Sequence, residues 1–288
     1  MNSMAILQSG TPSKLAILSG KGGTGKTFVA TNLASVMGEV FYVDCDVEEP
    51  NGSLFLHPEQ ESVERIEVTI PRVNQEKCSG CRLCVDTCKF NAIALVQDKA
   101  VVLEDMCHSC GACFLVCPKG ALVSTPIENG VIRTGISNQI HVLTGEMLPG
   151  KESGEPILHA LLKKIENPPH TVIMDCPPGT GCLVTECVRE ADYCMIVTEP
   201  TLFGFHDFLR ALDLVHHYKK PFGILINKWL NPNNQVEEYA LAYELPIIAK
   251  IPFEKKVSRI YSTGELVTNH DSKYRIFFQN LANYLFGK

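Results

Sequence analysis

The chain has 288 residues, of which 45% are hydrophobic and 20% charged, and its formal net charge is −6. A chain of this length can bury a large core, and its negative charge disfavours binding to nucleic acid or an anionic membrane. No apolar run approaches the roughly 20 residues that span a bilayer, and the first ten residues lack the features of a secretory signal. We therefore expect a folded cytoplasmic protein with no transmembrane segment and no nucleic-acid partner.

The predicted elements alternate between strand and helix along the chain. Apolar runs at 15–18 and 41–44 predict buried strands, and the apolar stripe between them predicts a helix over 28–37. Residues 63–70 alternate in polarity and predict a strand that ends at Pro71. Further strands are predicted at 171–175, 193–200, 221–227 and 246–252. This alternation predicts an α/β fold with a doubly wound, mostly parallel sheet.

The thirteen cysteines are the unusual feature of the composition. An odd number of cysteines in a chain without a secretory signal argues against a disulfide framework and for metal ligation. Eight of them lie between residues 71 and 124. We therefore expect one α/β domain, formed by residues 1–70 and 125–288, with a small α+β domain inserted at 71–124.

A phosphate-binding loop is predicted between the first strand and the first helix. The segment GKGGTGKT matches the pattern G-x-x-x-x-G-K-S/T. Glycines there let successive N–H groups point at phosphate oxygens, and the following helix N-terminus favours negative charge. A glycine-rich turn without a ligand is the alternative, which the strand, the helix and the Lys-Thr pair disfavour. The expected nucleotide-binding residues are Gly20, Lys21, Gly22, Gly23, Thr24, Gly25, Lys26 and Thr27.

Polar residues at the ends of other strands complete the predicted site. Asp44 and Asp46 follow the second strand, Asp175 ends the strand at 171–175, and Asn227 and Lys228 end another. Ligands of open parallel sheets bind outside the carboxyl ends of the strands, so these side chains are expected beside the phosphate loop. Lys26 would reach the β- and γ-phosphates, and Thr27 would bind Mg²⁺.

Two cysteine motifs of the same form lie in the insert. Cys78, Cys81, Cys84 and Cys88 have the spacing C-x₂-C-x₂-C-x₃-C, and Cys107, Cys110, Cys113 and Cys117 repeat it 29 residues later. This spacing is typical of 4Fe–4S ligation and resembles the bacterial two-cluster ferredoxins. Two zinc sites are the alternative, although zinc sites usually pair two C-x-x-C units across a longer gap.

The ferredoxin resemblance implies that the fourth ligand of each cluster comes from the other motif. Lys89 follows Cys88, whereas Pro118 follows Cys117, so we expect the turn after Cys88 to differ from the turn after Cys117. We also expect the positive charge of Lys89 to alter the reduction potential of the cluster that Cys88 ligates. The implied ligand sets are Cys78, Cys81, Cys84 and Cys117 for the first cluster, and Cys107, Cys110, Cys113 and Cys88 for the second.

Five cysteines lie outside the insert. Free cysteine is usually a small buried hydrophobe, which is the expectation for Cys45, Cys176, Cys187 and Cys194. Cys182 lies seven residues after Asp175, a spacing similar to that of a cluster ligand in the nitrogenase iron protein. A cluster bridging two copies through Cys182 is therefore a hypothesis, although no second cysteine occurs at 118–175.

The motifs together resemble one family. The loop K-G-G-x-G-K-T, the aspartates, the segments DCPPGTGC and TEPTLFGFHD, and the insert are similar to MinD-superfamily P-loop ATPases that carry an inserted ferredoxin domain. The resemblance covers residues 14–267 and implies MgATP binding, ATP hydrolysis, a homodimer with nucleotide at its interface, and two 4Fe–4S clusters.

The same resemblance implies roles for individual residues. Lys21 would reach across the dimer to the partner's phosphates, and Asp46 would position the attacking water. Asp44 would support the magnesium shell, and Asp175 would contact Mg²⁺ through water. Asn227 and Lys228 would hold the base, and because Leu230 replaces the aspartate of a guanine-selecting motif, adenine is favoured.

Three functions remain open from the sequence. The first is electron transfer to an unidentified redox partner, gated by ATP-driven dimer rearrangement, and the second is an Mrp-type iron–sulfur carrier. No C-x-x-C lies outside the insert, which counts against the carrier. The third is a MinD-like spatial regulator, for which the apolar stripe of the C-terminal helix would lie on a membrane. Such a helix more often docks on its own core, as expected here for Tyr274, Phe277, Phe278, Leu281 and Leu285.

Overall fold

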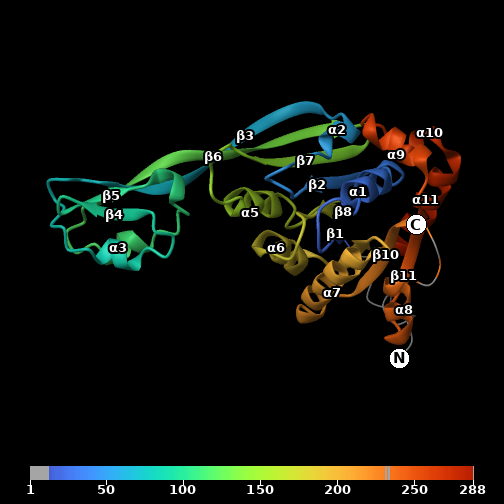
Figure 1. Ribbon diagram of the computed structural model, residues 1–288. Helices are drawn as coiled ribbons and strands as arrows, with labels where there is room; N and C mark the ends of the chain where they lie inside the picture. Colours follow the sequence, from blue (N-terminus) through green and yellow to red (C-terminus); the bar gives the residue numbers. More distant parts are fainter. Residues whose placement is uncertain (1–12, 231, 233, 288) are drawn as a thin grey trace.

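The structure, a computed structural model, describes residues 13–230, 232 and 234–287 (Figure 1). The first ten residues, for which we expect no secretory signal, lie outside the described residues. The strands are β1 (Lys14–Leu18), β2 (Val40–Asp44), β3 (Glu59–Val73), β4 (Ile93–Val96), β5 (Lys99–Val102), β6 (Leu122–Ser137), β7 (Ile140–Met147), β8 (Val172–Asp175), β9 (Tyr193–Thr198), β10 (Phe222–Trp229) and β11 (Ile247–Pro252).

The helices of the described residues connect these strands. They are α1 (Lys26–Ser35), α2 (Ser53–Leu56), α3 (Leu83–Thr87), the 3-10 helix η2 (Glu104–Met106), α4 (Ala112–Val116), α5 (Glu155–Lys164), α6 (Cys182–Glu190), α7 (Leu202–His217), α8 (Gln235–Ala242), α9 (Lys255–Ser262), α10 (Val267–His270) and α11 (Ser272–Phe286).

Within the described residues, nine strands form one sheet in the order β11-β10-β9-β1-β8-β2-β7-β6-β3. The pairs from β11 to β7 are parallel, whereas β6 pairs antiparallel with both β7 and β3. Every residue of β1, β8 and β9 is buried, as expected for parallel strands covered on both faces. The predicted α/β fold with a mostly parallel sheet is therefore confirmed.

Two layers of helices bury the two faces of this sheet. Helices α5, α6, α7 and α8 pack on one face, and α1, α10 and α11 pack on the other (Figure 1). The C-terminal helix α11 buries Tyr274, Phe278, Leu281 and Leu285 in the second layer, with Phe277 packed against it. The expectation that this helix docks on its own core is confirmed.

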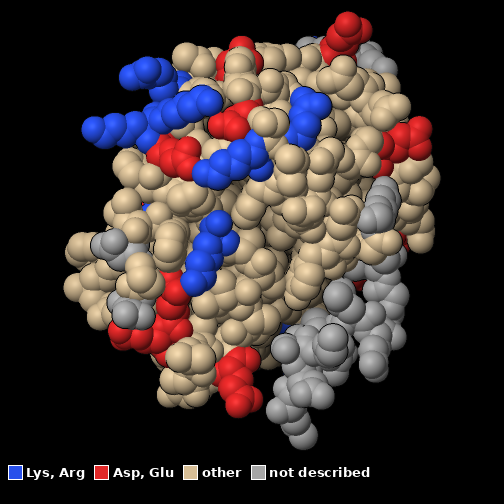
Figure 2. Space-filling view, turned by 90° about the vertical axis from the view of Figure 1, so that its right-hand side faces the viewer, with Lys and Arg blue, Asp and Glu red and all other residues tan. Residues whose placement is uncertain are grey.

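The surface over the C-terminal elements carries charges of both signs. Lys and Arg side chains gather in the upper part of the face in Figure 2, with acidic side chains between them. Lys256 pairs with Asp271 at 3.1 Å, and Lys273 pairs with Glu254 at 2.6 Å. Cations of α9 and α11 are therefore neutralised by neighbouring carboxylates.

Strands β3 and β6 extend beyond the sheet as a two-stranded ribbon (Figure 1). The ribbon carries residues 74–121, which we call the cysteine lobe and which contain the hairpin β4-β5 and helices α3 and α4. Across the ribbon Ile70 pairs with Thr125 and Pro71 with Ser124, so the boundaries expected at 70/71 and 124/125 face each other.

Two sequence-based expectations about strands are wrong. The strand expected at 63–70 runs from 59 to 73 and does not end at Pro71. Proline is tolerated because β3 is the edge strand, where a missing N–H leaves no interior ladder bond unmade. Strands β6 and β7 were not predicted at all, because Gly130, Gly135 and Gly145 interrupt their apolar pattern.

Candidate functional site

The predicted phosphate loop lies between β1 and α1, and its conformation requires glycine at three positions, Gly20, Gly23 and Gly25. Gly23 and Gly25 have φ of 78° and 97°, in the left-handed region that favours glycine. A Cβ on Gly25 would lie 2.3 Å from Nδ2 of Asn227, and one on Gly20 would lie 1.9 Å from the carbonyl oxygen of Asp207 in α7. The loop is therefore packed closely between the ends of α7 and β10.

Two buried carboxyl groups lie beside the start of α1. Asp44 and Asp175 are register partners at the carboxyl ends of β2 and β8, and each is 1% exposed. Asp175 Oδ2 accepts a hydrogen bond from the Tyr42 hydroxyl at 2.9 Å, while Oδ1 has no partner. Burial raises the pKa of Asp175, although the Thr27 hydroxyl and the Lys26 charge oppose this. An unpartnered, buried carboxylate oxygen beside Thr27 suits a hard cation such as Mg²⁺.

Asp44 is held by backbone groups. Its Oδ2 accepts hydrogen bonds from the N–H groups of Asn51 and Gly52 at 3.0 and 2.8 Å, and its Oδ1 accepts one from Asp46 at 3.3 Å. Burial, followed by the charge of Asp175, raises the pKa of Asp44 well above its ordinary value. The carboxyl group thereby fixes the segment after β2.

Asp46 extends from that segment toward Lys26. Burial raises its pKa to about 6, although the charge of Lys26 opposes the rise. Lys26 itself is 7% exposed at the first position of α1. A carboxylate with a pKa close to neutrality can accept a proton from an approaching water molecule.

A cavity of about 260 Å³ lies on the other side of the loop. Asn227 and Lys228, for which the resemblance implies contact with the base, line it, and the Asn227 side-chain amide donates to the Thr24 carbonyl at 2.7 Å. Sequence reasoning missed Phe253 and Tyr261, whose rings also line the cavity. An apolar cavity beside a phosphate loop is suited to a flat base.

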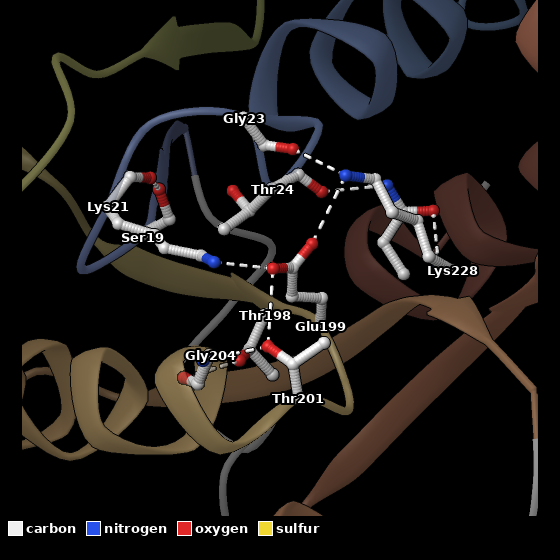
Figure 3. Close-up of polar contacts among 10 residues, drawn as sticks. Ser19, Lys21, Gly23, Thr24, Thr198, Glu199, Thr201, Gly204 and Lys228 are labelled. Carbon is white, nitrogen blue, oxygen red and sulfur yellow. Dashed lines mark hydrogen bonds and ion pairs between the residues drawn. The ribbon is translucent and has the colours of Figure 1, made fainter.

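Lys21 contacts a residue that the sequence analysis did not identify. Its ammonium pairs with Oε1 of Glu199 at 2.5 Å, and Lys228 pairs with Oε2 at 3.1 Å (Figure 3). Glu199 directly follows β9, just as Asp44 and Asp175 are the last residues of β2 and β8. A carboxylate at the end of a parallel strand was the signal that could have found it.

The eight lobe cysteines form two groups. One small cavity is lined by Cys78, Cys81, Cys84 and Cys117. Burial raises the pKa of Cys84, and the nearby Cys117 adds to the rise. Burial also raises the pKa of Cys107, and the nearby Cys110 and Cys88 add to it. Cys88 and Cys117 are thus each close to a cysteine of the other motif. No group of three or more His, Cys, Asp or Glu side chains in the described ranges is arranged to hold a single metal ion.

The two motifs have the same backbone conformation. Asn91 and Gly120, also 29 residues apart, both adopt positive φ, of 55° and 54°. The amide after each donates to a cysteine sulfur, from Ala92 to Cys88 at 3.3 Å and from Ala121 to Cys117 at 3.2 Å. Cys88 (φ −71°, ψ 107°) and Cys117 (φ −82°, ψ 104°) also have similar dihedral angles, so the expectation of a different turn after Cys88 is wrong.

The cysteine lobe and the domain that carries the phosphate loop together line one small cavity. Cys107 and His108 line a small cavity together with Lys151 and Glu152, in the loop before α5. That loop ends at Gly154, where a Cβ would lie 2.3 Å from Cγ2 of Val47. Val47 directly follows Asp46 in the chain. The loop before α5 therefore connects the surroundings of Cys107 with the segment that carries Asp46.

The remaining cysteines are placed as follows. Cys45, Cys176, Cys187 and Cys194 are buried, which confirms that expectation. Cys182 is exposed at the first position of α6.

No helix of the described residues is long and apolar enough to cross a bilayer.

The phosphate loop, the strand-end aspartates and the parallel sheet define a P-loop nucleotide-binding protein. The family model of the CobQ/CobB/MinD/ParA nucleotide-binding domain matches residues 15–267, so the chain belongs to this family of P-loop ATPases. Two uncharacterized proteins of Methanocaldococcus jannaschii are similar to it: one is 30% identical over 267 residues (90% of this chain, 91% of that one), and the other 29% over 282 residues (94% and 97%).

The fold is similar to that of MinD. The structure of the septum site-determining protein MinD from Pyrococcus horikoshii, complexed with Mg-ADP, covers 94% of this chain and 95% of its own. The TM-score is 0.57 and the sequence identity 17%, so the likeness concerns the fold.

Proposed function

We propose that this protein binds and hydrolyses MgATP and couples an ATP-driven rearrangement of a homodimer to electron transfer through two 4Fe–4S clusters. The observation that carries the coupling is the small cavity that the cysteine lobe lines together with the loop that packs on Val47. Asp46 and Val47 are adjacent, so a movement of Asp46 on nucleotide binding would displace Val47 against Gly154. Lys151 and Glu152 of the same loop would transmit it to the segment of Cys107 and His108.

The nucleotide half of this proposal assigns the residues of the phosphate loop. Gly20 to Thr27 would hold the phosphates, with Lys26 on the transferred group and Thr27 on Mg²⁺. The buried, unpartnered Oδ1 of Asp175 would accept from a water molecule of the magnesium shell. Asp46 would take the proton of the attacking water. Asn227 and Lys228, at the cavity, would contact adenine.

The iron–sulfur half assigns the lobe cysteines in the crossed sets, Cys78, Cys81, Cys84 and Cys117 for one cluster, and Cys107, Cys110, Cys113 and Cys88 for the other. In a 4Fe–4S cluster each cysteine binds a different iron atom, so its four sulfurs are spread more widely than around a single ion. The spacing of the cysteines suits this better than zinc, whose sites usually pair two C-x-x-C units across a longer gap. The clusters would supply one-electron redox chemistry.

The backbone of the lobe also suits anionic sulfur ligands. Amides of Ala92, Ala100 and Ala121 donate to cysteine sulfurs. The amide of Ala100 is the main reason that the pKa of Cys78 is lowered. Hydrogen bonds to the sulfurs stabilise thiolate ligands and raise the reduction potential of a cluster. Oxygen-labile clusters would fit a cytoplasmic setting.

Anaerobic EPR of iron-loaded, dithionite-reduced protein tests this function, with spectra recorded with and without MgATP. We expect two coupled centres whose signals change on addition of MgATP in the wild type. The matched control is Lys26→Ala, which retains every cysteine and should show no change. Wild-type EPR signals that do not change on addition of MgATP would contradict the coupling of ATP to the clusters. The clusters would then transfer electrons without control by nucleotide.

Two alternatives have specific observations in their favour. The exposed Cys182 favours an Mrp-type carrier, for which iron would move to an apo-acceptor protein on addition of ATP. The fold favours a MinD-like spatial regulator, although the apolar stripe of α11 is buried in the core. Co-sedimentation of the protein with lipid vesicles only in the presence of ATP would favour the spatial regulator over the electron-transfer function.

A further inference from the structure

The ammonium of Lys21 has a carboxylate partner within the chain. It pairs with Glu199 at 2.5 Å, and the Lys21 side chain is only 30% exposed. The backbone of Lys21 is fixed as well, because the Ser19 hydroxyl donates to the Lys21 carbonyl at 2.6 Å. Ser19 also accepts, through its own carbonyl, from Gly179 at 3.1 Å. Only the side chain of Lys21 is therefore free to change its partner.

Glu199 is held rigidly at the end of β9. Its side chain is 12% exposed, and the Thr201 hydroxyl donates to Oε1 at 3.3 Å. Thr201 caps α7 by accepting from the Gly204 amide at 3.0 Å. A Cβ on Gly204 would lie 2.3 Å from the Glu199 carbonyl oxygen, so the turn leaves little room to move.

A second lysine keeps Glu199 paired when Lys21 leaves. Lys228 binds Oε2 at 3.1 Å and donates to the Gly23 carbonyl at 2.7 Å (Figure 3). Lys228 has a φ of 52°, a strained conformation for a side-chain-bearing residue, which its backbone hydrogen bond to Asn227 Oδ1 holds. A buried carboxylate left without a partner would be costly, and Lys228 with Thr201 prevents this.

We propose that Glu199 is the positioning residue of Lys21, and that nucleotide phosphates must compete with its carboxylate for the Lys21 ammonium. The inference rests on the nucleotide-binding half of the proposed function and needs neither clusters nor a dimer. With Lys21 on Glu199, the ammonium is unavailable to phosphate oxygens of either copy. Nucleotide binding transfers it, and Lys228 remains with Glu199.

A double-mutant cycle on nucleotide affinity tests this step. ADP and ATPγS binding with Mg²⁺ is measured by calorimetry for the wild type, Glu199→Gln, Lys21→Ala and the double variant. We expect Glu199→Gln to tighten binding about fivefold when Lys21 is present and less than about twofold in the Lys21→Ala background. Equal effects in the two backgrounds, or no tightening, would overturn the proposal.

Two further measurements separate positioning from a structural role. Acetylation of Lys21, followed by mass spectrometry without nucleotide, should be several-fold faster in Glu199→Gln than in the wild type, and unchanged rates would overturn the proposal. The matched control is Glu190→Gln, which removes a carboxylate paired with Lys14 at 3.3 Å and should change neither readout.

If Glu199→Gln does not fold, Glu199→Asp replaces it. The side chain is one methylene shorter and keeps the charge, so its pairing with Lys21 should weaken. Nucleotide binding should then again be tighter, and only when Lys21 is present. The two proposals fail separately. If the effects of Glu199→Gln and Lys21→Ala on nucleotide affinity are coupled but the EPR signals do not change with MgATP, this inference stands and ATP-gated electron transfer is contradicted. If the EPR signals change with MgATP but the two substitutions act independently, this inference is contradicted and gating stands.

Discussion

Asp44 and Asp175 stand opposite each other at the carboxyl ends of the adjacent parallel strands β2 and β8, both 1% exposed. Burial is the main reason that both carboxyl groups have a raised pKa, and the charge of Asp175 raises that of Asp44 further. Two buried carboxyl groups so close together disfavour ionisation until a cation arrives. Under the proposed function, Mg²⁺ binding would therefore favour ionisation of this pair.

Replacing Asp175 with asparagine should abolish the contribution of Mg²⁺ to nucleotide binding. The amide can still accept from the Tyr42 hydroxyl, but it lacks the charge that orders the magnesium shell. We expect ADP to bind wild type and Asp175→Asn alike in EDTA, and the wild type about tenfold more tightly than the variant with Mg²⁺. Calorimetry in the two buffers measures this, and an equal gain from Mg²⁺ in both proteins would contradict the assignment.

The stability of the nucleotide-free protein should fall as pH rises through about 6. The pKa of Asp46 is raised to about 6 in the fold, above its unfolded value, so the folded state binds the proton more tightly. The stabilisation is fully present below the unfolded pKa near 4 and is lost as pH rises through 6. Asp46→Asn should flatten this part of the curve. Urea unfolding without Mg²⁺ at pH 4 to 7.5 measures the effect, and identical pH profiles would contradict it.

Replacing Gly25 with alanine should destabilise the fold and weaken nucleotide binding. The φ of 97° and the 2.3 Å approach of a Cβ to Nδ2 of Asn227 both oppose any side chain there. We expect a loss of about 1–3 kcal/mol in the free energy of unfolding. Gly22→Ala is the control in the same loop, because the nearest atom to its Cβ would be 4.0 Å away. Urea unfolding without nucleotide compares them, and equal losses would show that the glycine geometry is not responsible.

Pairs of cysteine variants should distinguish crossed from uncrossed ligation. With crossed ligation, Cys84→Ser combined with Cys117→Ser damages one cluster and leaves about half of the iron. Cys84→Ser combined with Cys88→Ser damages both clusters. Uncrossed ligation predicts the opposite ranking of iron content after anaerobic reconstitution.

Iron counting on Cys182→Ala tests the bridging cluster separately. Cys182 is exposed and lies outside the cysteine lobe, so this variant should fold normally. Unchanged iron would end the hypothesis of a cluster shared through Cys182. A loss of iron would bring the carrier function forward.

Replacing Gly154 with alanine should weaken the effect of nucleotide binding on the cysteine lobe. A side chain there would meet Cγ2 of Val47, and relieving the overlap would shift the loop that lines a cavity with Cys107 and His108. We expect Gly154→Ala to bind MgATP with unchanged affinity but to lose much of the ATP-dependent change in the EPR spectrum. Gly181→Ala is the control, since nothing lies within 4 Å of its Cβ. An undiminished spectral change in Gly154→Ala would exclude this route.

Local patterns in the sequence determined the phosphate loop, the parallel strands and the spacing of the cysteines. Each depends on neighbours in the chain: the glycine turn between β1 and α1, the apolar runs of buried strands, and the short gaps between thiols. The same locality explains the errors. Pro71 looked like a strand end because the sequence does not show that β3 is an edge strand.

Only the tertiary structure decided which distant residues meet. Lys21 and Glu199 are 178 residues apart in the chain, and they pair because β1 and β9 are neighbours in the sheet. Likewise, Gly154 reaches Val47 because β2 and β7 are neighbours in the sheet. Cys107 and Lys151, 44 residues apart, line one cavity. A sequence specifies its local conformations through residues a few positions apart, whereas long-range contacts depend on strand order and packing, which no short pattern encodes.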